Sequence, residues 1–217
     1  MRTAVDTVRM AWTYSPSASV WRKRVHLVGA AESGQVTSVV RFEEDSKFPR
    51  HDHPDGEEIL VLEGVFSDEY GDWPAGTFLL NPEGFEHEPF SRPGCVLFVK
   101  LRQYPGRQRR HIVVDTSAQA WEPTANVGIA RKMLYEQSGF SDVICLERWE
   151  SGTEPGTVRY VHGAELFVLE GALTDEEGSY RAGCWLRFPV GSKHRPRSTE
   201  GCILYAKRGG LSYLRAG

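Results

Sequence analysis

The stretch that decides the fold runs His51-Asp52-His53-Pro54-Asp55-Gly56-Glu57-Glu58-Ile59-Leu60-Val61-Leu62-Glu63-Gly64. Two histidines precede a Pro-Asp-Gly turn sequence, and a run of aliphatic residues typical of a short strand follows it. Residues i and i+2 of a β-strand face the same side, so His51 and His53 project together while Asp52 projects away. The stretch therefore predicts a strand with two imidazoles, a turn, and a returning strand that begins with a carboxylate.

A second segment carries a third histidine after another turn. Its spacing is Gly76-x5-Pro82-x-Gly84-x2-His87. Three neutral imidazoles and a carboxylate suit a divalent transition metal, whereas calcium and magnesium favour oxygen ligands. We therefore predict one metal site formed by His51, His53, Glu57 and His87. Glu58 is adjacent to Glu57, and strand alternation lets only one of them face inward. The six-residue spacing to Gly64 favours Glu57, which leaves Glu58 for a structural contact.

The chain contains an internal repeat. Leu62-Glu63-Gly64 returns as Leu169-Glu170-Gly171, at an offset of 107 residues. The same offset pairs further residues over most of the chain, namely Gly56 with Gly163, Asp68 with Asp175, Gly76 with Gly183, Pro82 with Pro189, and His87 with His194. At the front, Val5-Asp6-Thr7 matches Val114-Asp115-Thr116 at an offset of 109. We predict a metal-binding domain at residues 1–102, a solvated linker at 103–112, and a degenerate second copy at 113–217.

Each repeat has the pattern of an all-β domain. Runs of four to eight β-branched and aromatic residues alternate with Gly/Pro turn sequences, and no stretch keeps a helical period beyond a turn or two. Thr37–Phe42, Ile59–Leu62 and Val96–Val99 are examples of such runs. Short strands at regular spacing predict a sandwich or barrel, and two tandem jelly rolls fit the repeat best.

Composition narrows the range of partners and compartments. The 217 residues carry a formal net charge of -3 with no long run of one sign, which argues against a nucleic acid or a membrane surface as partner. The N-terminal residues lack a signal-peptide core, and no apolar run approaches the roughly 20 residues that span a bilayer. The four cysteines are scattered without a CxxC motif and are expected to be buried free thiols. We expect a cytoplasmic protein.

The two histidine segments resemble the two motifs of the cupin superfamily, so the whole chain resembles a bicupin. The sequence from His51 to Glu69 more specifically resembles that of the cupin domain of ChrR-type anti-sigma factors. That resemblance implies a double-stranded β-helix and a zinc ion on the residues that match His51, His53, Glu57 and His87. It also implies a role in the response to singlet oxygen. Proteins of that type hold their sigma factor with a separate helical domain that carries a CxxC, and this chain shows neither feature.

The second repeat has lost most of the ligand set. At an offset of 107, the positions of His51, His53, Glu57 and His87 hold, in that order, Val158, Tyr160, Ala164 and His194. One imidazole cannot hold a divalent ion against water. One alternative is a site rebuilt from His162, Glu165 and His194. Another is a metal-free pocket lined by Arg148, Tyr160 and His194. A degenerate copy kept for stability or to build the interface between the domains is favoured.

Two functions remain open on the sequence, and the first, with zinc as the metal, is favoured. The first is a zinc-binding sensor or regulatory module, which the ChrR resemblance implies and which would hold zinc with closed tetrahedral geometry. The second is a small-molecule metalloenzyme, such as a cupin dioxygenase or isomerase with iron, manganese or nickel. The partner would be a small molecule or a regulatory protein, and exposed strand edges allow a homodimer. Fold alone does not separate these functions.

Overall fold

The computed structural model describes residues 2–213, and these form antiparallel β-strands with two short 3₁₀ helices, η1 (Thr7–Arg9) and η2 (Leu211–Tyr213). The chain divides into two compact units. We call Met10–Ala118 with Tyr213 the first barrel, and Gln119–Ser212 with residues 2–9 the second barrel. The predicted all-β class is confirmed. Within residues 2–213 we find no helix with the length and apolar character that crossing a membrane requires.

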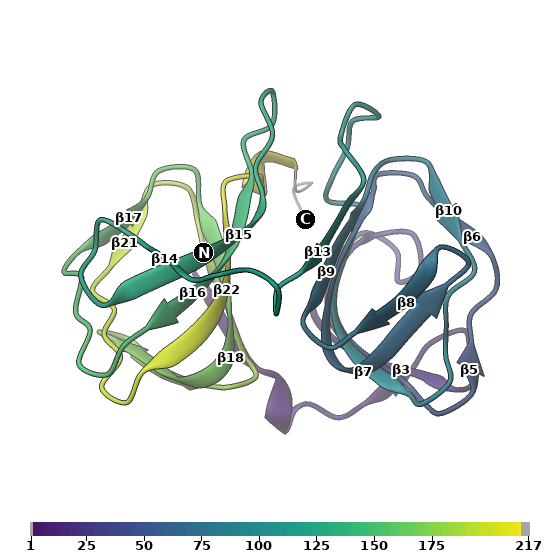
Figure 1. Ribbon diagram of the computed structural model, residues 1–217, viewed down its shortest axis with the longest axis horizontal. Coiled ribbons are helices and arrows are strands. Elements are labelled where there is room, and N and C mark those ends of the chain that lie inside the picture. Colours follow the sequence, from purple (N-terminus) through teal and green to yellow (C-terminus); the bar gives the residue numbers. More distant parts are fainter. Residues whose placement is uncertain (1, 214–217) are drawn as a thin grey trace. The chain divides into compact units, whose positions relative to one another are not determined.

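The first barrel contains strands β2 to β13 (Figure 1). Their bounds are β2 (Thr13–Tyr14), β3 (Val20–Val28), β4 (Gln35–Phe42), β5 (Ser46–Lys47), β6 (His51–His53), β7 (Glu57–Asp68), β8 (Gly71–Pro74), β9 (Thr77–Asn81), β10 (Phe85–His87), β11 (Phe90–Ser91), β12 (Cys95–Leu101) and β13 (Ile112–Asp115). The main sheet runs β13-β9-β7-β12-β4-β3-β2, and β6 pairs with β10 in a separate two-stranded sheet.

The second barrel repeats this arrangement. Its strands are β1 (Thr3–Asp6), β14 (Glu122–Pro123), β15 (Ile129–Tyr135), β16 (Val143–Trp149), β17 (Val158–Tyr160), β18 (Ala164–Asp175), β19 (Gly178–Arg181), β20 (Cys184–Phe188), β21 (Ser192–His194) and β22 (Cys202–Arg208). The main sheet runs β1-β20-β18-β22-β16-β15-β14, and β17 pairs with β21. The strand orders match position by position, so the sequence repeat is also a repeat of topology.

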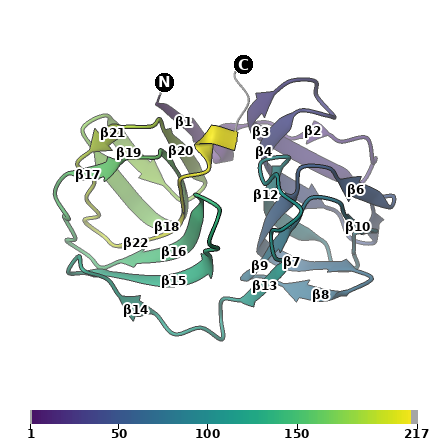
Figure 2. The ribbon, with the colours of Figure 1, turned by 90° about the horizontal axis from the view of Figure 1, so that it is seen from above.

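The two repeats exchange their N-terminal strands. β1 pairs with β20 of the second barrel, with Val5 opposite Trp185, whereas β13 pairs with β9 of the first barrel, with Val114 opposite Phe78 (Figure 2). β1 and β13 are counterparts at the offset of 109, so each barrel takes its edge strand from the other repeat. The predicted boundaries at 1–102 and 113–217 are therefore corrected, because residues 2–9 belong to the second barrel and 112–118 to the first.

The segment 103–112 is not a solvated linker. Gln103, Tyr104 and Arg109 are buried. The Tyr104 hydroxyl donates a hydrogen bond to the Glu58 carboxylate, and the Gln103 amide donates to the carbonyl of Val36 at 2.7 Å. The basic residues of this segment suggested solvent exposure, but hydrogen bonds to the sheet hold it against the first barrel.

Alternation along the strands produces the core of the first barrel. One face of β3, β4, β7, β9 and β12 turns apolar side chains inward, and these form a cluster of buried residues, namely Val20, Phe42, Ile59, Val61, Phe66, Leu79, Cys95, Leu97 and Val99. All four cysteines are buried and free, as the sequence predicts. Gly64 lies in β7 where it meets the turn at Gly94. It has a φ of 72°, and a Cβ at this position would lie 2.0 Å from the Gly94 carbonyl oxygen. Only glycine fits there, which explains the repeated Leu-Glu-Gly sequence.

Candidate metal centre

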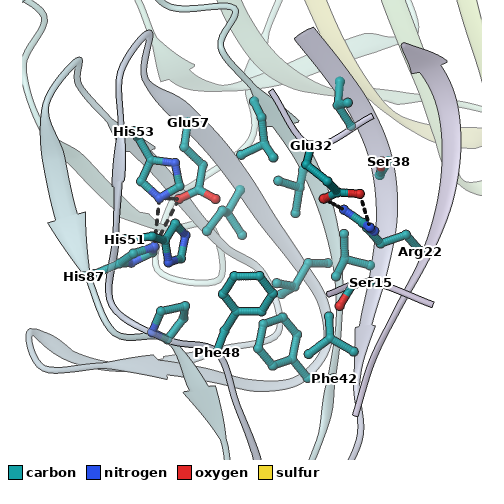
Figure 3. A pocket seen from close by; sticks show the side chains of 18 of the residues that line it. Ser15, Arg22, Glu32, Ser38, Phe42, Phe48, His51, His53, Glu57 and His87 are labelled. Atoms are coloured by element: carbon teal, nitrogen blue, oxygen red, sulfur yellow. Dashed lines mark hydrogen bonds and ion pairs between the residues drawn. The ribbon is translucent and has the colours of Figure 1, made fainter. Parts of the chain in front are cut away.

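Three histidines converge on the first barrel from two short paired strands. In the antiparallel pair of β6 and β10, His87 lies directly opposite His51, and His53 follows two residues later on the same face. His53 and His87 are buried, and His51 is half-buried. One donor atom from each of the three lies within 4.8 Å of the others (Figure 3). The structure brings these three residues together, so His51, His53 and His87 could bind a metal, and their role as ligands stays a prediction.

Acceptors around the histidines fix which ring nitrogen is available. The Nδ1 of His51 lies 2.8 Å from the carbonyl oxygen of Pro49, and the Nδ1 of His87 lies 3.2 Å from Oδ2 of Asp68. Both acceptors require a proton on Nδ1, which leaves Nε2 unprotonated and free to ligate. Asp68 is a residue of the candidate site that the ligand motif missed. Its return as Asp175 in the second repeat was the signal that could have identified it.

Glu57 points at the same place from the start of β7. Its Oε2 lies 3.3 Å from Nε2 of His53 and 3.6 Å from Nε2 of His87, and it accepts a hydrogen bond of 2.9 Å from the Asn81 amide. The two histidine Nε2 atoms are 3.0 Å apart. A single ion with bonds of about 2.1 Å separates neighbouring ligand atoms by about 3.0 Å at a right angle and about 3.4 Å at the tetrahedral angle. These separations suit one ion shared by His53, His87 and Glu57, with His51 close by, and ligation by Glu57 stays a prediction.

Glu58 faces away from this site, as strand alternation requires. Its carboxylate is buried under the Tyr104 hydroxyl, on the opposite side of β7 from Glu57. The counterpart Glu165 in β18 is also buried, and it accepts a 2.6 Å hydrogen bond from Nε of Arg187. The repeated glutamate therefore has a structural contact in each barrel.

The electrostatics of the site favour a bound cation. Burial lowers the pKa of His53 to about 4, so this imidazole is neutral near pH 7 and able to ligate. Burial acts in the same direction on His87, but the hydrogen bond to Asp68 and the charge of Glu57 outweigh it and raise the pKa of His87. Two buried carboxylates thus stabilise positive charge at the point where the imidazoles meet.

A cavity of about 170 Å³ adjoins the histidines within the first barrel. The three histidines and Glu57 line one end, and Arg22 and Glu32 line the other (Figure 3). Apolar side chains form the wall between the ends, among them Val40, Phe42, Ile59, Leu97, Val99 and Leu101. The sequence motifs gave no sign of this cavity, because its lining comes from strands spread over much of the repeat.

The second barrel has an aromatic cluster at the corresponding position. The Tyr160 hydroxyl lies 3.0 Å from Nε2 of His194, the same separation as between His53 and His87 in the first barrel. Nδ1 of His194 lies 2.9 Å from Oδ2 of Asp175, and the ring of Phe188 packs 4.4 Å from the His194 ring. Tyr160 and His194 are therefore brought together as predicted, in a packed cluster.

Arg148 does not join that cluster. Its side chain is exposed and its guanidinium lies 4.9 Å from the centroid of the Trp121 ring. The predicted pocket of Arg148, Tyr160 and His194 is wrong on this residue, because the inward positions of β16 are those of Cys145 and Glu147. The site rebuilt from His162, Glu165 and His194 is not assembled either. His162 is exposed, and Glu165 is engaged by Arg187.

The fold and the three-histidine centre define a doubled cupin barrel. The family described as ChrR Cupin-like domain matches residues 1–105 and again residues 109–212. The chain belongs to this family and contains two of its domains. No curated protein matches it.

Solved structures of cupin proteins resemble the whole chain. A candidate dioxygenase from Nostoc punctiforme is 14% identical over 97% of this chain and 84% of its own, with a TM-score of 0.79. A bacterial pirin from Escherichia coli, solved in complex with nickel(II), is 14% identical over 96% of this chain and 99% of its own, with a TM-score of 0.71. A mutant oxalate decarboxylase from Bacillus subtilis is 10% identical over 94% and 76%, with a TM-score of 0.65. Identities this low establish the fold alone.

Proposed function

We propose that the first barrel is a small-molecule metalloenzyme site with one divalent transition metal on His51, His53, His87 and Glu57. The observation that carries this proposal is the cavity of about 170 Å³, because all four of these residues line it. A structural metal is enclosed by its protein ligands, whereas a catalytic metal keeps a position open to solvent or substrate. An open face beside an apolar cavity suits the second arrangement.

The residues around the ion have defined tasks in this proposal. A bound iron, manganese, nickel or zinc ion would supply Lewis-acid chemistry, and iron or manganese also redox chemistry, to a molecule in the cavity. Asp68 holds the ring of His87 in the ligating tautomer, and Asn81 orients the Glu57 carboxylate. The apolar wall excludes bulk water from the bound molecule. Solved relatives include a candidate dioxygenase and an oxalate decarboxylase, which agrees with enzymatic use of this fold.

A zinc-binding regulatory module is the second candidate, and one measurement of the site favours it. Oε2 of Glu57 is 3.3 and 3.6 Å from two histidine Nε2 atoms, so four protein donors could close around a tetrahedral zinc. The ion would then respond to a signal through its ligands and offer no position to a substrate. The family name, which refers to ChrR, agrees with this alternative.

Cobalt(II) separates the two candidates, because its visible absorption is strong in a tetrahedral site and weak with five or six ligands. The protein, freed of metal and reloaded with cobalt(II), is expected to show weak bands that shift when azide is added. Strong bands that azide leaves unchanged would favour the regulatory module and overturn the enzyme proposal.

A matched pair of variants locates the ion. His87→Gln should lose the bound cobalt(II), whereas His194→Gln should keep one equivalent. These two residues occupy the same position of the repeat, and both rings bond an aspartate through Nδ1. Loss of the metal in both variants would instead indicate a general effect on folding.

A further inference from the structure

A bidentate ion pair between an arginine and a carboxylate lies at the end of the cavity away from the histidines. Nη1 and Nη2 of Arg22 each lie 2.9 Å from a different carboxylate oxygen of Glu32, and Arg24 contacts the same carboxylate at 2.7 Å. Two parallel contacts of this kind are the geometry with which an arginine recognises any planar carboxylate. Arg22 and Glu32 line the cavity, and Arg24 is not among its lining residues.

The two members of this pair differ in exposure. The Arg22 side chain is 15% exposed, whereas the Glu32 side chain is 53% exposed. Glu32 lies in the loop between β3 and β4, and the hydrogen bond to Arg22 lowers the pKa of its carboxyl, so it is ionised at neutral pH. An exposed carboxylate moves into water at little cost, while the guanidinium stays in place on β3. Glu32 is therefore the replaceable member of the pair.

Positive charge is in excess at this end. Arg22 and Arg24 share one carboxylate, so two guanidinium charges face a single carboxylate charge. Ser38 adds a buried hydroxyl to the lining, and this oxygen has no hydrogen-bond partner within residues 2–213. A group that carries negative charge and accepts hydrogen bonds would satisfy both features.

We propose that the cavity binds a small organic acid whose carboxylate replaces Glu32 on Arg22, while an oxygen at its other end reaches the metal. The proposal rests on the proposed function, because the metal anchors the second end. The apolar wall between the two ends requires an apolar spacer in the molecule, for example a short alkyl chain or one aromatic ring. Arg22 is then the specificity-determining residue of the site, and Glu32 covers it until the acid binds.

The second barrel supports this reading because the same interior positions are filled there. Ser38, Val40 and Leu101 line the cavity of the first barrel, and their counterparts in the strand register are Cys145, Glu147 and Arg208. Glu147 and Arg208 form an ion pair of 2.6 Å, and Nη1 of Arg208 lies 3.7 Å from the Cys145 sulfur. The repeat that lost the metal ligands thus holds charged side chains where the metal-binding repeat has cavity lining.

The test is a binding series on the full chain reloaded with cobalt(II). The probes are linear dicarboxylates from succinate to suberate, each compared with the monocarboxylate of equal length by calorimetry and by the cobalt(II) spectrum. We expect one dicarboxylate to bind at least about tenfold more tightly than its monocarboxylate, because only the former reaches Arg22. Arg22→Gln should abolish that preference. Glu32→Gln should tighten dicarboxylate binding, because it removes the competing carboxylate.

Arg24→Gln is the matched control, since Arg24 contacts Glu32 from outside the cavity lining and the preference should persist. Equal binding of dicarboxylate and monocarboxylate would overturn the inference, as would a preference that survives in Arg22→Gln or weaker binding in Glu32→Gln. These failures are distinct from failure of the proposed function. Protein that binds cobalt(II) and azide but shows no dicarboxylate preference refutes only the inference, and protein that binds no cobalt(II) refutes the metal site itself.

Discussion

Replacing Asp68 with asparagine should weaken metal binding without changing any ligand. Oδ2 of Asp68 accepts the Nδ1 proton of His87, while Oδ1 accepts from the Tyr70 amide and the Trp73 indole. The amide of asparagine must turn an N–H either toward His87 or toward these two donors. In the first case the His87 proton moves to Nε2, where it blocks the metal. In the second case His87 keeps its acceptor, but the Tyr70 amide and the Trp73 indole lose theirs.

The expected loss is about 10- to 100-fold in metal affinity, or about 1.4 to 2.8 kcal/mol. The 3.2 Å hydrogen bond is long, which favours the lower end of that range. The substitution also removes a negative charge close to the bound dication, which weakens binding further and favours the upper end of the range.

Competition with a chelator of known affinity measures the dissociation constant of the metal in Asp68→Asn. Asp175→Asn is the control. Asp175 makes the equivalent 2.9 Å contact to His194, in the barrel where the other predicted ligands are replaced. It should leave metal affinity within about twofold. An Asp68→Asn affinity equal to that of the unchanged protein, or an equal loss in both variants, would refute the reasoning.

Three further predictions concern the barrels. Gly64→Ala should destabilise the first barrel by about 4 kcal/mol or prevent folding, because its Cβ would lie 2.0 Å from a carbonyl oxygen. Gly84→Ala is the control, since no atom lies within 4 Å of its Cβ, and it should cost only about 1 to 2 kcal/mol. Urea unfolding measures both free energies. Burial opposes ionisation of Asp175, but hydrogen bonds from His194, the Glu177 amide and the Arg2 guanidinium lower its pKa to about 2. The ionised carboxylate of Asp175 therefore stabilises the fold above its ordinary pKa of 3.8, and this contribution is lost as the pH falls toward 2. The difference in unfolding free energy between the unchanged protein and Asp175→Asn should narrow from pH 5 to pH 2.5. A difference independent of pH would contradict this. All four cysteines should resist a thiol reagent in the native state and react in denaturant, since they are buried and burial raises the pKa of Cys95, for example, to about 11; rapid native labelling would count against it.

The convergence of the three histidines could be predicted because their placement depends on local rules. Strand alternation puts His51 and His53 on one face, and the turn that ends at Gly84 sends His87 into the next strand. Alternation also separates Glu57 from Glu58. No long-range information is needed for any of these steps.

The exchange of β1 and β13 could not be predicted, because the two arms carry the same Val-Asp-Thr pattern and the two sheet edges are alike. Either arm satisfies either edge, and the choice depends on how the connecting residues run in space. Arg148 was misplaced for a different reason. It lies on the outward side of β16, and both its guanidinium and that of its repeat counterpart Arg41 pack against tryptophan rings, those of Trp121 and Trp12.

The cavity and its Arg22–Glu32 pair were also invisible in the sequence. Arg22 lies in a strand and Glu32 in the following loop, with no motif spacing between them, and their pairing depends on the loop folding back over the barrel. The volume of a cavity depends on many side chains together. The sequence alone therefore does not show that Val40 lines a cavity while its counterpart Glu147 fills the same position in the second barrel.

The most direct measurement is an anomalous difference map from crystals of the metal-loaded protein, collected at the absorption edge of the metal. One peak is expected, within bonding distance of Nε2 of His51, His53 and His87, with a Glu57 oxygen as its neighbour and no peak at Tyr160 and His194. A map with no peak among the three histidines, or with its peak in the second barrel, would contradict the central claim.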